Sequence, residues 1–300
     1  IIIRLIILLV LGNRIGTFLF WKLSGQREAM VFQNSKLSYN PFSLLFSIMS
    51  EWLAYTISDI SLLFGVYLIA ALAKGVTGLG FSTTCLPMLV LIFGLKPTLP
   101  FLIIPSIASN LLVMSQAGEF KVTLKQFWPL YLTQVPGVLI GLSLLLWLAP
   151  YISTAILGIT LIIYCSFTLS NPEFQLPNHL QRRLALPTGF LTGVINGFTG
   201  SQVMPLLPYM LSLGLSPSRF VQAINCSFTL SSLFMALGLF ELKLMTLEIV
   251  LISMMGIIPV YIGTKIGSKT REHLNLLMFR RLVLISLILM GCALTGQFLS

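Results

Sequence analysis

Long apolar runs separated by short polar connections dominate the chain from about residue 58 onward. Many of the runs approach the length of about 20 residues that an α-helix needs to cross the hydrocarbon core of a bilayer. The pattern predicts membrane-spanning helices over 60–79, 82–96, 98–117, 128–148, 151–169, 184–200, 203–214, 217–239, 246–266 and 275–297. The two short members, 82–96 and 203–214, are also compatible with half-helices that begin at a break.

Two of the runs are interrupted by matching segments that are rich in glycine and polar residues. The segment from Lys74 to Pro87 has the sequence KGVTGLGFSTTCLP, and the segment from Asn196 to Pro208 has the sequence NGFTGSQVMPLLP. In lipid, a helix is broken only where its freed backbone groups meet protein, water or a ligand. Paired Gly- or Pro-interrupted apolar segments in corresponding places of two halves are typical of the binding site of a secondary transporter.

The two interrupted segments occupy equivalent positions in an internal repeat of the sequence. The pairs Gly78 and Gly200, Glu119 and Glu241, Lys121 and Lys243, and Gly141 and Gly263 are each 122 residues apart. Because each half contains an odd number of predicted spans, the halves should be inverted across the membrane. We predict an all-α polytopic membrane protein with about ten transmembrane helices in two inverted five-helix repeats with glycine-broken helices.

The predicted domain limits follow from this repeat. The first transmembrane repeat covers 58–170, a cytoplasmic connection covers 171–183, and the second repeat covers 184–300. Residues 1–57 mix aromatic and basic side chains and are predicted to be an interfacial segment or the end of a truncated helix.

Over roughly residues 58–296 the chain resembles the sulfite exporter TauE/SafE family of membrane transporters. The resemblance rests on both glycine motifs, on the turns Gly94-Leu-Lys-Pro97 and Gly214-Leu-Ser-Pro217 that follow them, and on the prolines between. It implies export of sulfite or of another small sulfur-containing anion.

Composition and charge agree with a membrane protein. The chain is 56% hydrophobic and 9% charged, with a mean hydropathy of +0.97, whereas soluble domains have about 25% charged residues. The net charge of +10 is carried mostly by connections between apolar runs. We therefore expect the basic residues to fix cytoplasmic loops of a multi-pass protein of the cell (inner) membrane, with the lipid bilayer and not nucleic acid as the partner.

Catalytic constellations are missing from the sequence. The two histidines, His179 and His273, both lie in connections, and Asp59 is the one aspartate of the chain. The Walker A motif and the His-Glu-x-x-His motif are absent, and the four cysteines stand alone in apolar runs. The sequence predicts neither an enzyme nor a catalytic residue, a metal site or a cofactor.

Lys74 is the most informative candidate for binding a substrate. It lies in an apolar run just before the first glycine break, where its charge can face an anion near the middle of the membrane. The alternative is that its side chain extends to an interface. Its counterpart in the second half, Asn196, is uncharged but can form hydrogen bonds.

The other candidates flank the two breaks or lie in the third span of each half. Helices that restart after Gly80 and Gly200 would direct free N–H groups toward a shared gap. Close helix packing is the alternative for the glycines, and polar contacts between helices are the alternative for the asparagines. The predicted substrate-binding residues beside Lys74 and Asn196 are Gly75, Thr77, Gly78, Gly80, Ser82, Thr83, Asn110, Gly197, Thr199, Gly200, Ser201, Gln202 and Asn225.

The carboxylates lie in connections or at loop edges, with Glu248 at the very start of the predicted span 246–266, so we expect no dedicated proton relay. An anion exporter needs none, because a potential that is negative inside drives each negative charge outward with about 2.3 kcal/mol per 100 mV. The sequence predicts a secondary transporter that exports a small anion. The alternatives are an organic-acid transporter, a passive anion channel and a membrane scaffold that transports nothing. The paired breaks argue against the scaffold, because a scaffold has no need to interrupt two spans.

Overall fold

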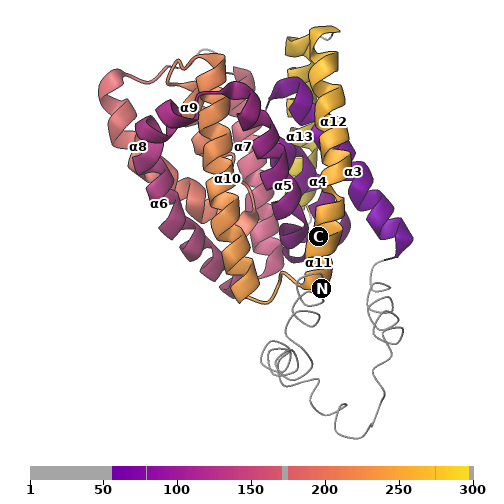
Figure 1. The fold of residues 1–300 in the computed structure, drawn as a ribbon. Helices are drawn as coiled ribbons and strands as arrows, with labels where there is room; N and C mark the ends of the chain where they lie inside the picture. Colours follow the sequence, from indigo (N-terminus) through magenta and orange to yellow (C-terminus); the bar gives the residue numbers. More distant parts are fainter. Residues whose placement is uncertain (1–55, 79, 171–174, 274, 297–300) are drawn as a thin grey trace, which may run out of the picture. The chain divides into compact units, whose positions relative to one another are not determined.

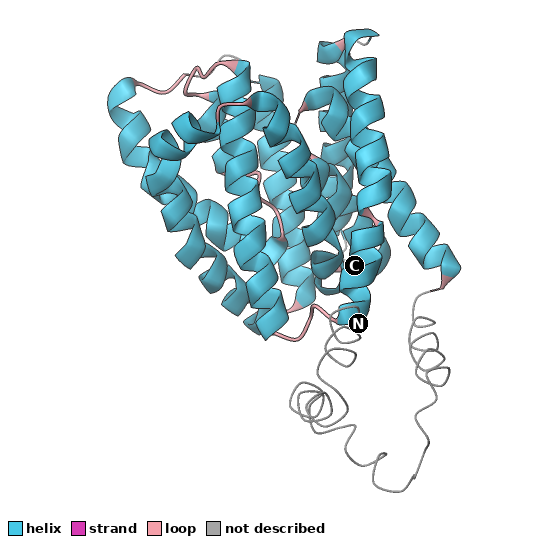
Figure 2. Cartoon of the chain, in the orientation of Figure 1, coloured by secondary structure: helices cyan, strands magenta, loops and turns pink. Residues whose placement is uncertain are grey.

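The computed structural model describes residues 56–78, 80–170, 175–273 and 275–296. Almost all of the predicted N-terminal segment, 1–57, lies outside the described residues, as does part of the predicted connection over 171–183. Within the described part all regular secondary structure is helical and there is no strand (Figures 1 and 2). Its elements are α3 (Ile57–Thr77), α4 (Phe81–Phe93), α5 (Leu95–Ala117), α6 (Phe120–Trp147), α7 (Pro150–Ser170), α8 (Asn178–Thr199), α9 (Leu206–Leu211), α10 (Pro217–Glu241), α11 (Leu247–Met255), α12 (Ile257–Thr270), the 3₁₀-helix η3 (Arg271–His273) and α13 (Leu276–Gly296).

Seven segments of the described chain are long and apolar enough to cross a membrane. They are α3, α5, α6, α7, α10, the pair α11 and α12 taken together, and Met278–Gly296 of α13. The sequence predicts ten spans, and the three predicted spans that are missing from this set correspond to α4, α8 and α9. Helices α4 and α9 have 13 and 6 residues, too few to cross a core of about 30 Å at 1.5 Å per residue. Helix α8 begins with the polar run that contains His179, Arg182 and Arg183.

Both predicted helix interruptions are present and lie inside the protein. Helix α3 ends at Thr77 and is followed by Gly78 with a φ of 75°, while α8 ends at Thr199 and is followed by Gly200 with a φ of 76°. Glycine reaches this left-handed conformation without a steric penalty, which makes it the usual terminator of a helix. The two interruptions differ in length, because α4 restarts at Phe81 but α9 restarts only at Leu206 (Figure 2).

Three pairs of helices approach so closely that glycine is required at the contact, and one of them is α7 with α13 at Gly158 and Gly291. Helices α6 and α8 pack along their length, and a Cβ atom at Gly193 would lie 2.3 Å from the Gln134 carbonyl oxygen. Helices α3 and α12 pack in the same manner, and a Cβ atom at Gly75 would lie 2.4 Å from the Thr264 carbonyl oxygen. Small residues four positions apart allow this close packing of backbones in membranes.

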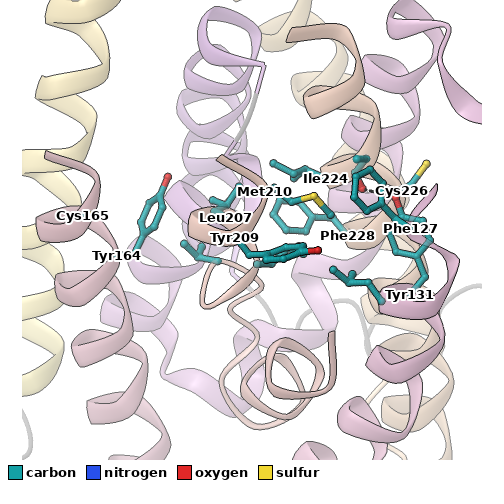
Figure 3. Close-up of a cluster of buried hydrophobic side chains, with 14 of the residues drawn as sticks. Phe127, Tyr131, Tyr164, Cys165, Leu207, Tyr209, Met210, Ile224, Cys226 and Phe228 are labelled. Atoms are coloured by element: carbon teal, nitrogen blue, oxygen red, sulfur yellow. Dashed lines mark hydrogen bonds between the residues drawn. The ribbon is translucent and has the colours of Figure 1, made fainter. Parts of the chain in front are cut away.

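An apolar cluster fixes the short helix α9 between its neighbours (Figure 3). Leu207, Tyr209 and Met210 of α9 lie between α7 on one side and α6 and α10 on the other. The Tyr131 hydroxyl of α6 donates a hydrogen bond to the Ala223 carbonyl of α10 at 3.0 Å. This packing positions the segment that follows the second interruption even though α9 is shorter than two helical turns.

The outer faces of the long helices are apolar and exposed. On α6 these residues include Leu132, Leu139 and Leu146, and on α12 they include Ile258 and Ile262. Large apolar side chains on the outside of a long apolar helix are typical of a surface in contact with lipid chains.

Candidate functional site

Lys74 lies in the last turn of α3, immediately before the first interruption, and is only 1% exposed. Its ammonium group donates hydrogen bonds to Asn225 Oδ1 at 2.9 Å, to Ser109 Oγ at 3.3 Å and to Asn110 Oδ1. These contacts use all three donors of an ammonium group. The alternative that Lys74 extends to a membrane interface is therefore wrong, because its charged end is held inside the helix bundle.

Helices α5 and α10 supply these partners and hold them in place. Asn225 Nδ2 donates to the Val221 carbonyl of its own helix at 2.7 Å, which leaves its oxygen directed at Lys74. The Ser109 hydroxyl donates to the Ser106 carbonyl at 2.8 Å and accepts from Lys74. Three helices thus fix the position of one positive charge.

The positive charge of Lys74 is paired with neutral oxygens and not with a carboxylate. Among the described residues, the recorded ion pair joins Arg219 and Glu119 at 3.6 Å, with both side chains partly exposed. A buried charge is unfavourable unless it is compensated. The Asn110 Nδ2 and Thr264 Oγ1 atoms nearby are also buried and have no hydrogen-bond partner. The cluster therefore combines an uncompensated cation with an unused amide donor, an arrangement that suits an anion.

A cavity of about 650 Å³ leads from this cluster to the surface. Its inner end is lined by the buried residues Lys74, Gly75, Gly78, Val113 and Thr264, and its mouth is lined by the exposed residues Gln116, Pro217, Ser218 and Arg271. The mouth therefore lies where α5 and α12 end and where α10 begins. Both charged residues of the lining, Lys74 and Arg271, are basic.

The structure divides most of the predicted site residues among three cavities. Lys74, Gly75 and Gly78 line the large cavity, and Asn110 and Asn225 contact Lys74. A second cavity of about 180 Å³ is lined by Thr77, Gly80 and Thr83 among others. A third cavity of about 20 Å³ is lined by Ser82, Asn196, Gly200 and Gln202 among others.

The remaining predicted residues lie near the second interruption without lining these cavities. A Cβ atom at Gly197 would lie 2.6 Å from the Cα atom of Gly141, so this glycine occupies a contact between α8 and α6. The Thr199 hydroxyl donates to the Ile195 carbonyl at 2.6 Å and accepts from the Ser201 amide at 3.1 Å. Close packing, the alternative for the glycines, thus describes Gly197 and also Gly75.

The 180 Å³ cavity differs from the Lys74 cavity in its charge. It lies between the start of α4 and α13, and its lining is mostly apolar, with Tyr164, Leu207 and Leu284 among its members. Its charged member, Arg280, is exposed. We therefore place the candidate site at Lys74, where the charge is buried.

Three residues of the Lys74 site were not predicted from the sequence. Ser109 contacts Lys74 directly, Thr264 lies beside Gly75 with a free hydroxyl, and Arg271 lines the mouth. The position of Ser109 next to Asn110 was a usable signal, since adjacent residues on one helix can both reach a neighbouring side chain. Thr264 follows Gly263, which belongs to the internal repeat, but nothing in the sequence indicates that the Thr264 hydroxyl lies near Lys74.

A resident metal ion has no visible ligand set in the described part of the chain. No group of three or more His, Cys, Asp or Glu side chains there is arranged to hold one. The site consists of an ammonium group, amides and hydroxyls.

Seven apolar spans, two interruptions inside the bundle and a buried lysine at the end of an open cavity define a multi-pass membrane protein of the transporter class. The family model described as sulfite exporter TauE/SafE matches residues 63–294. The chain therefore belongs to the TauE/SafE sulfite exporter family, which is a family of transporters and not of enzymes. Comparisons with curated proteins and with solved structures find no match.

Proposed function

We propose that this protein is a secondary transporter that carries a small anion, sulfite or another sulfur-containing anion, through the Lys74 cavity. The observation that supports it best is the buried ammonium group of Lys74, which has hydrogen-bond partners but no counter-charge. An anion that enters the cavity would supply that counter-charge. It would also find a free hydroxyl at Thr264 in the cavity lining, and the unpaired Nδ2 of Asn110 belongs to a side chain that contacts Lys74.

The energetic requirement for this transport is the replacement of the water that surrounds the anion. Opposite unit charges about 4 Å apart attract by about 4 kcal/mol at an effective dielectric constant of about 20. Hydrogen bonds from charged or amide donors add to this attraction. A lysine with nearby amide and hydroxyl groups therefore offsets part of the cost of removing that water.

The proposed architecture consists of two inverted repeats, and the element limits support it. Adding 122 to the bounds of α3 gives 179–199, against Asn178–Thr199 for α8. The same shift takes α5 to 217–239, against Pro217–Glu241 for α10. The close helix pairs also correspond under this shift. Helix α3 packs on α12, and its counterpart α8 packs on α6. Helix α6 is in turn the counterpart of α11 and α12.

The proposed orientation places the mouth of the Lys74 cavity in the cytoplasm of the cell. Helix ends near the mouth carry Lys121, Arg219, Lys269 and Arg271, whereas the short connections at the far end carry Lys96 and Lys243. An excess of basic residues marks cytoplasmic loops. An anion would enter from the cytoplasm and leave outward, driven by about 2.3 kcal/mol per charge for each 100 mV.

One observation favours a second candidate substrate class, the organic acids. A volume of about 650 Å³ lies within the range of about 300–1,000 Å³ that is typical of small-molecule sites. The cavity therefore has room for a carboxylate or an organic sulfonate as well as for an inorganic oxyanion. A passive channel is less well supported, because the Lys74 cavity and the 20 Å³ cavity are separate.

Flux measurements in proteoliposomes at a clamped membrane potential test the proposal. We expect saturable flux of sulfite or thiosulfate, acceleration by a potential that is negative on the side of entry, and counterflow of labelled anion against unlabelled anion. Sulfate and a dicarboxylate serve as the comparison substrates. Flux that stays linear in concentration would contradict a carrier, and a preference for the dicarboxylate over every sulfur anion would contradict the substrate class.

A further inference from the structure

The 20 Å³ cavity is lined by both polar and apolar side chains. Its polar lining comes from four helices and the second interruption and consists of Ser82, Ser106, Asn196, Gly200, Gln202 and Ser232. Its apolar lining consists of Leu99, Leu102, Ile103 and Met235, each at most 5% exposed. The space holds little more than one water molecule.

This small cavity occupies the place in the second half that the Lys74 cavity occupies in the first. Adding 122 to Lys74, Gly78 and Val113 gives Asn196, Gly200 and Met235, which line the small cavity. The hydrogen bonds also correspond, since Lys74 donates to Ser109 and Asn196 donates to Ser231, which is Ser109 shifted by 122, at 2.8 Å. The main difference between the two cavities is that the cation Lys74 of the first is replaced by the neutral amide Asn196 in the second.

The two cavities lie at different depths along α5 and α10. The Lys74 cavity reaches Gln116 at the end of α5 and Pro217 at the start of α10. The small cavity is lined by Leu99 and Leu102 from the first turns of α5 and by Ser232 and Met235 from the later part of α10. The small cavity therefore lies further from the open mouth, toward the other end of the helix bundle.

The far end is closed by side chains that are larger than their counterparts at the open end. Leu99 replaces Val221, and its Cδ2 lies 2.4 Å from the position that a Cβ atom at Gly200 would take. The counterpart of the exposed mouth residue Pro217 is Leu95, which is 2% exposed. The difference between the open and the closed end is thus a set of packed apolar side chains.

We propose that the Asn196 cavity, once widened by movement of Leu99 and Met235, is a second, uncharged subsite for the transported anion on its way out, and that these two side chains form the gate beyond it. This inference rests on the proposed transport function. Ser232 Oγ accepts a hydrogen bond from Gln202 Nε2 at 3.0 Å, which leaves its own proton available to an anion. Ser82 and Ser106 share one hydrogen bond at 2.6 Å, so one of their two protons is also available.

The absence of a cation at this subsite has a physical consequence for release. An anion held by Lys74 gains a charge–charge attraction, whereas an anion held by hydroxyl and amide donors gains only hydrogen bonds. The free energy of the bound anion therefore rises as it passes from the first subsite to the second. The membrane potential sets the direction of net movement, and weak retention at the second subsite lets the anion leave quickly once it reaches the exit.

Thiol labelling tests the gate without reference to the substrate. The experiment uses a Ser232→Cys variant of a chain whose own four cysteines are replaced by alanine, with a membrane-impermeant thiol reagent added on the side opposite the Lys74 mouth. We expect Leu99→Ala to make this labelling about tenfold faster, because Leu-to-Ala changes weaken the packing of the closed state. The matched control is Val221→Ala, the corresponding residue beside Gly78, which should leave the rate unchanged. Equal labelling rates of the Ser232→Cys variant with Leu99 intact and with Leu99→Ala would overturn the gate.

An added charge tests the second subsite. We expect Asn196→Lys to lower both the half-saturating anion concentration and the maximal flux, because the anion is then retained near the exit. A variant with the same maximal flux as the unmodified protein overturns the second subsite while leaving the transport proposal intact. If no anion is transported but Leu99→Ala still accelerates labelling, the gate stands and the transport proposal fails. If Asn196→Lys does not fold, an Asn196→Asp variant replaces it and is expected to reduce anion flux by repulsion.

Discussion

Replacing Lys74 by methionine is expected to reduce anion flux about a thousandfold, because about 4 kcal/mol of charge attraction is removed from the inner end of the cavity. Methionine preserves much of the length and volume of the buried stem, so α3 retains its packing. The neutral oxygens of Ser109, Asn110 and Asn225 lose their common donor. The measurement is the initial rate of sulfite or thiosulfate uptake into proteoliposomes with equal amounts of inserted protein.

Two further variants separate charge from structure at this position. Lys74→Arg retains a positive charge but changes the geometry, so we expect it to keep part of the flux. Lys269→Met removes an exposed lysine from α12 on the same side of the membrane and should leave the flux unchanged. Normal flux through Lys74→Met would remove Lys74 from the transport site and with it the main support for the proposed function.

The long apolar helices could be predicted closely where their ends coincide with turn residues. The predicted span 217–239 corresponds to α10 at Pro217–Glu241, and the predicted span 98–117 corresponds to α5 at Leu95–Ala117. The start of α6 was predicted eight residues late, at 128 and not at Phe120, because Lys121 and Lys125 make its first turns polar. Those two lysines are exposed, so a helix that extends beyond the apolar region tolerates them.

Breaks that depend on tertiary contacts could not be predicted from local pattern. The predicted span 246–266 is divided into α11 and α12 at Gly256, where a Cβ atom would lie 2.4 Å from the ring of Tyr67. Nothing near Gly256 in the sequence shows that an aromatic ring from α3 packs against it. The length of the second interruption was also missed, because the segment from Gly200 to Pro205 is non-helical, and Ser201, Gln202 and Val203 within it are buried by other helices.

The candidate site was only partly accessible to sequence reasoning. Lys74 could be identified because a charged residue inside an apolar run is unfavourable unless it has a function or a partner. The division of the flanking residues among three cavities could not be predicted, since it depends on which face of a break each side chain occupies. Thr77 and Gly78 are adjacent in the sequence but line different cavities.

The contact between α6 and α8 is the place where one added side chain should do the most damage to the fold. We expect Gly193→Leu to destabilise the protein by about 3 kcal/mol or more, because a Cβ atom there would meet the Gln134 carbonyl oxygen at 2.3 Å and the Val138 amide at 2.9 Å. These atoms belong to the backbone of α6 and cannot move aside as a flexible side chain can. Separation of the two helices would also disturb the contact at Gly197, next to the second interruption.

The matched control is the same substitution at Gly65 of α3, where a Cβ atom would have nothing within 4 Å. In detergent, thermal unfolding of Gly193→Leu should occur roughly 10 °C below that of Gly65→Leu, given about 2–4 °C per kcal/mol for a chain of this size. The Gly65→Leu variant should unfold close to the unmodified protein, because its leucine extends into open space or lipid. Equal unfolding temperatures for the two leucine variants would mean that α6 and α8 are not in backbone contact, and the exchange of helices between the two halves would have to be abandoned.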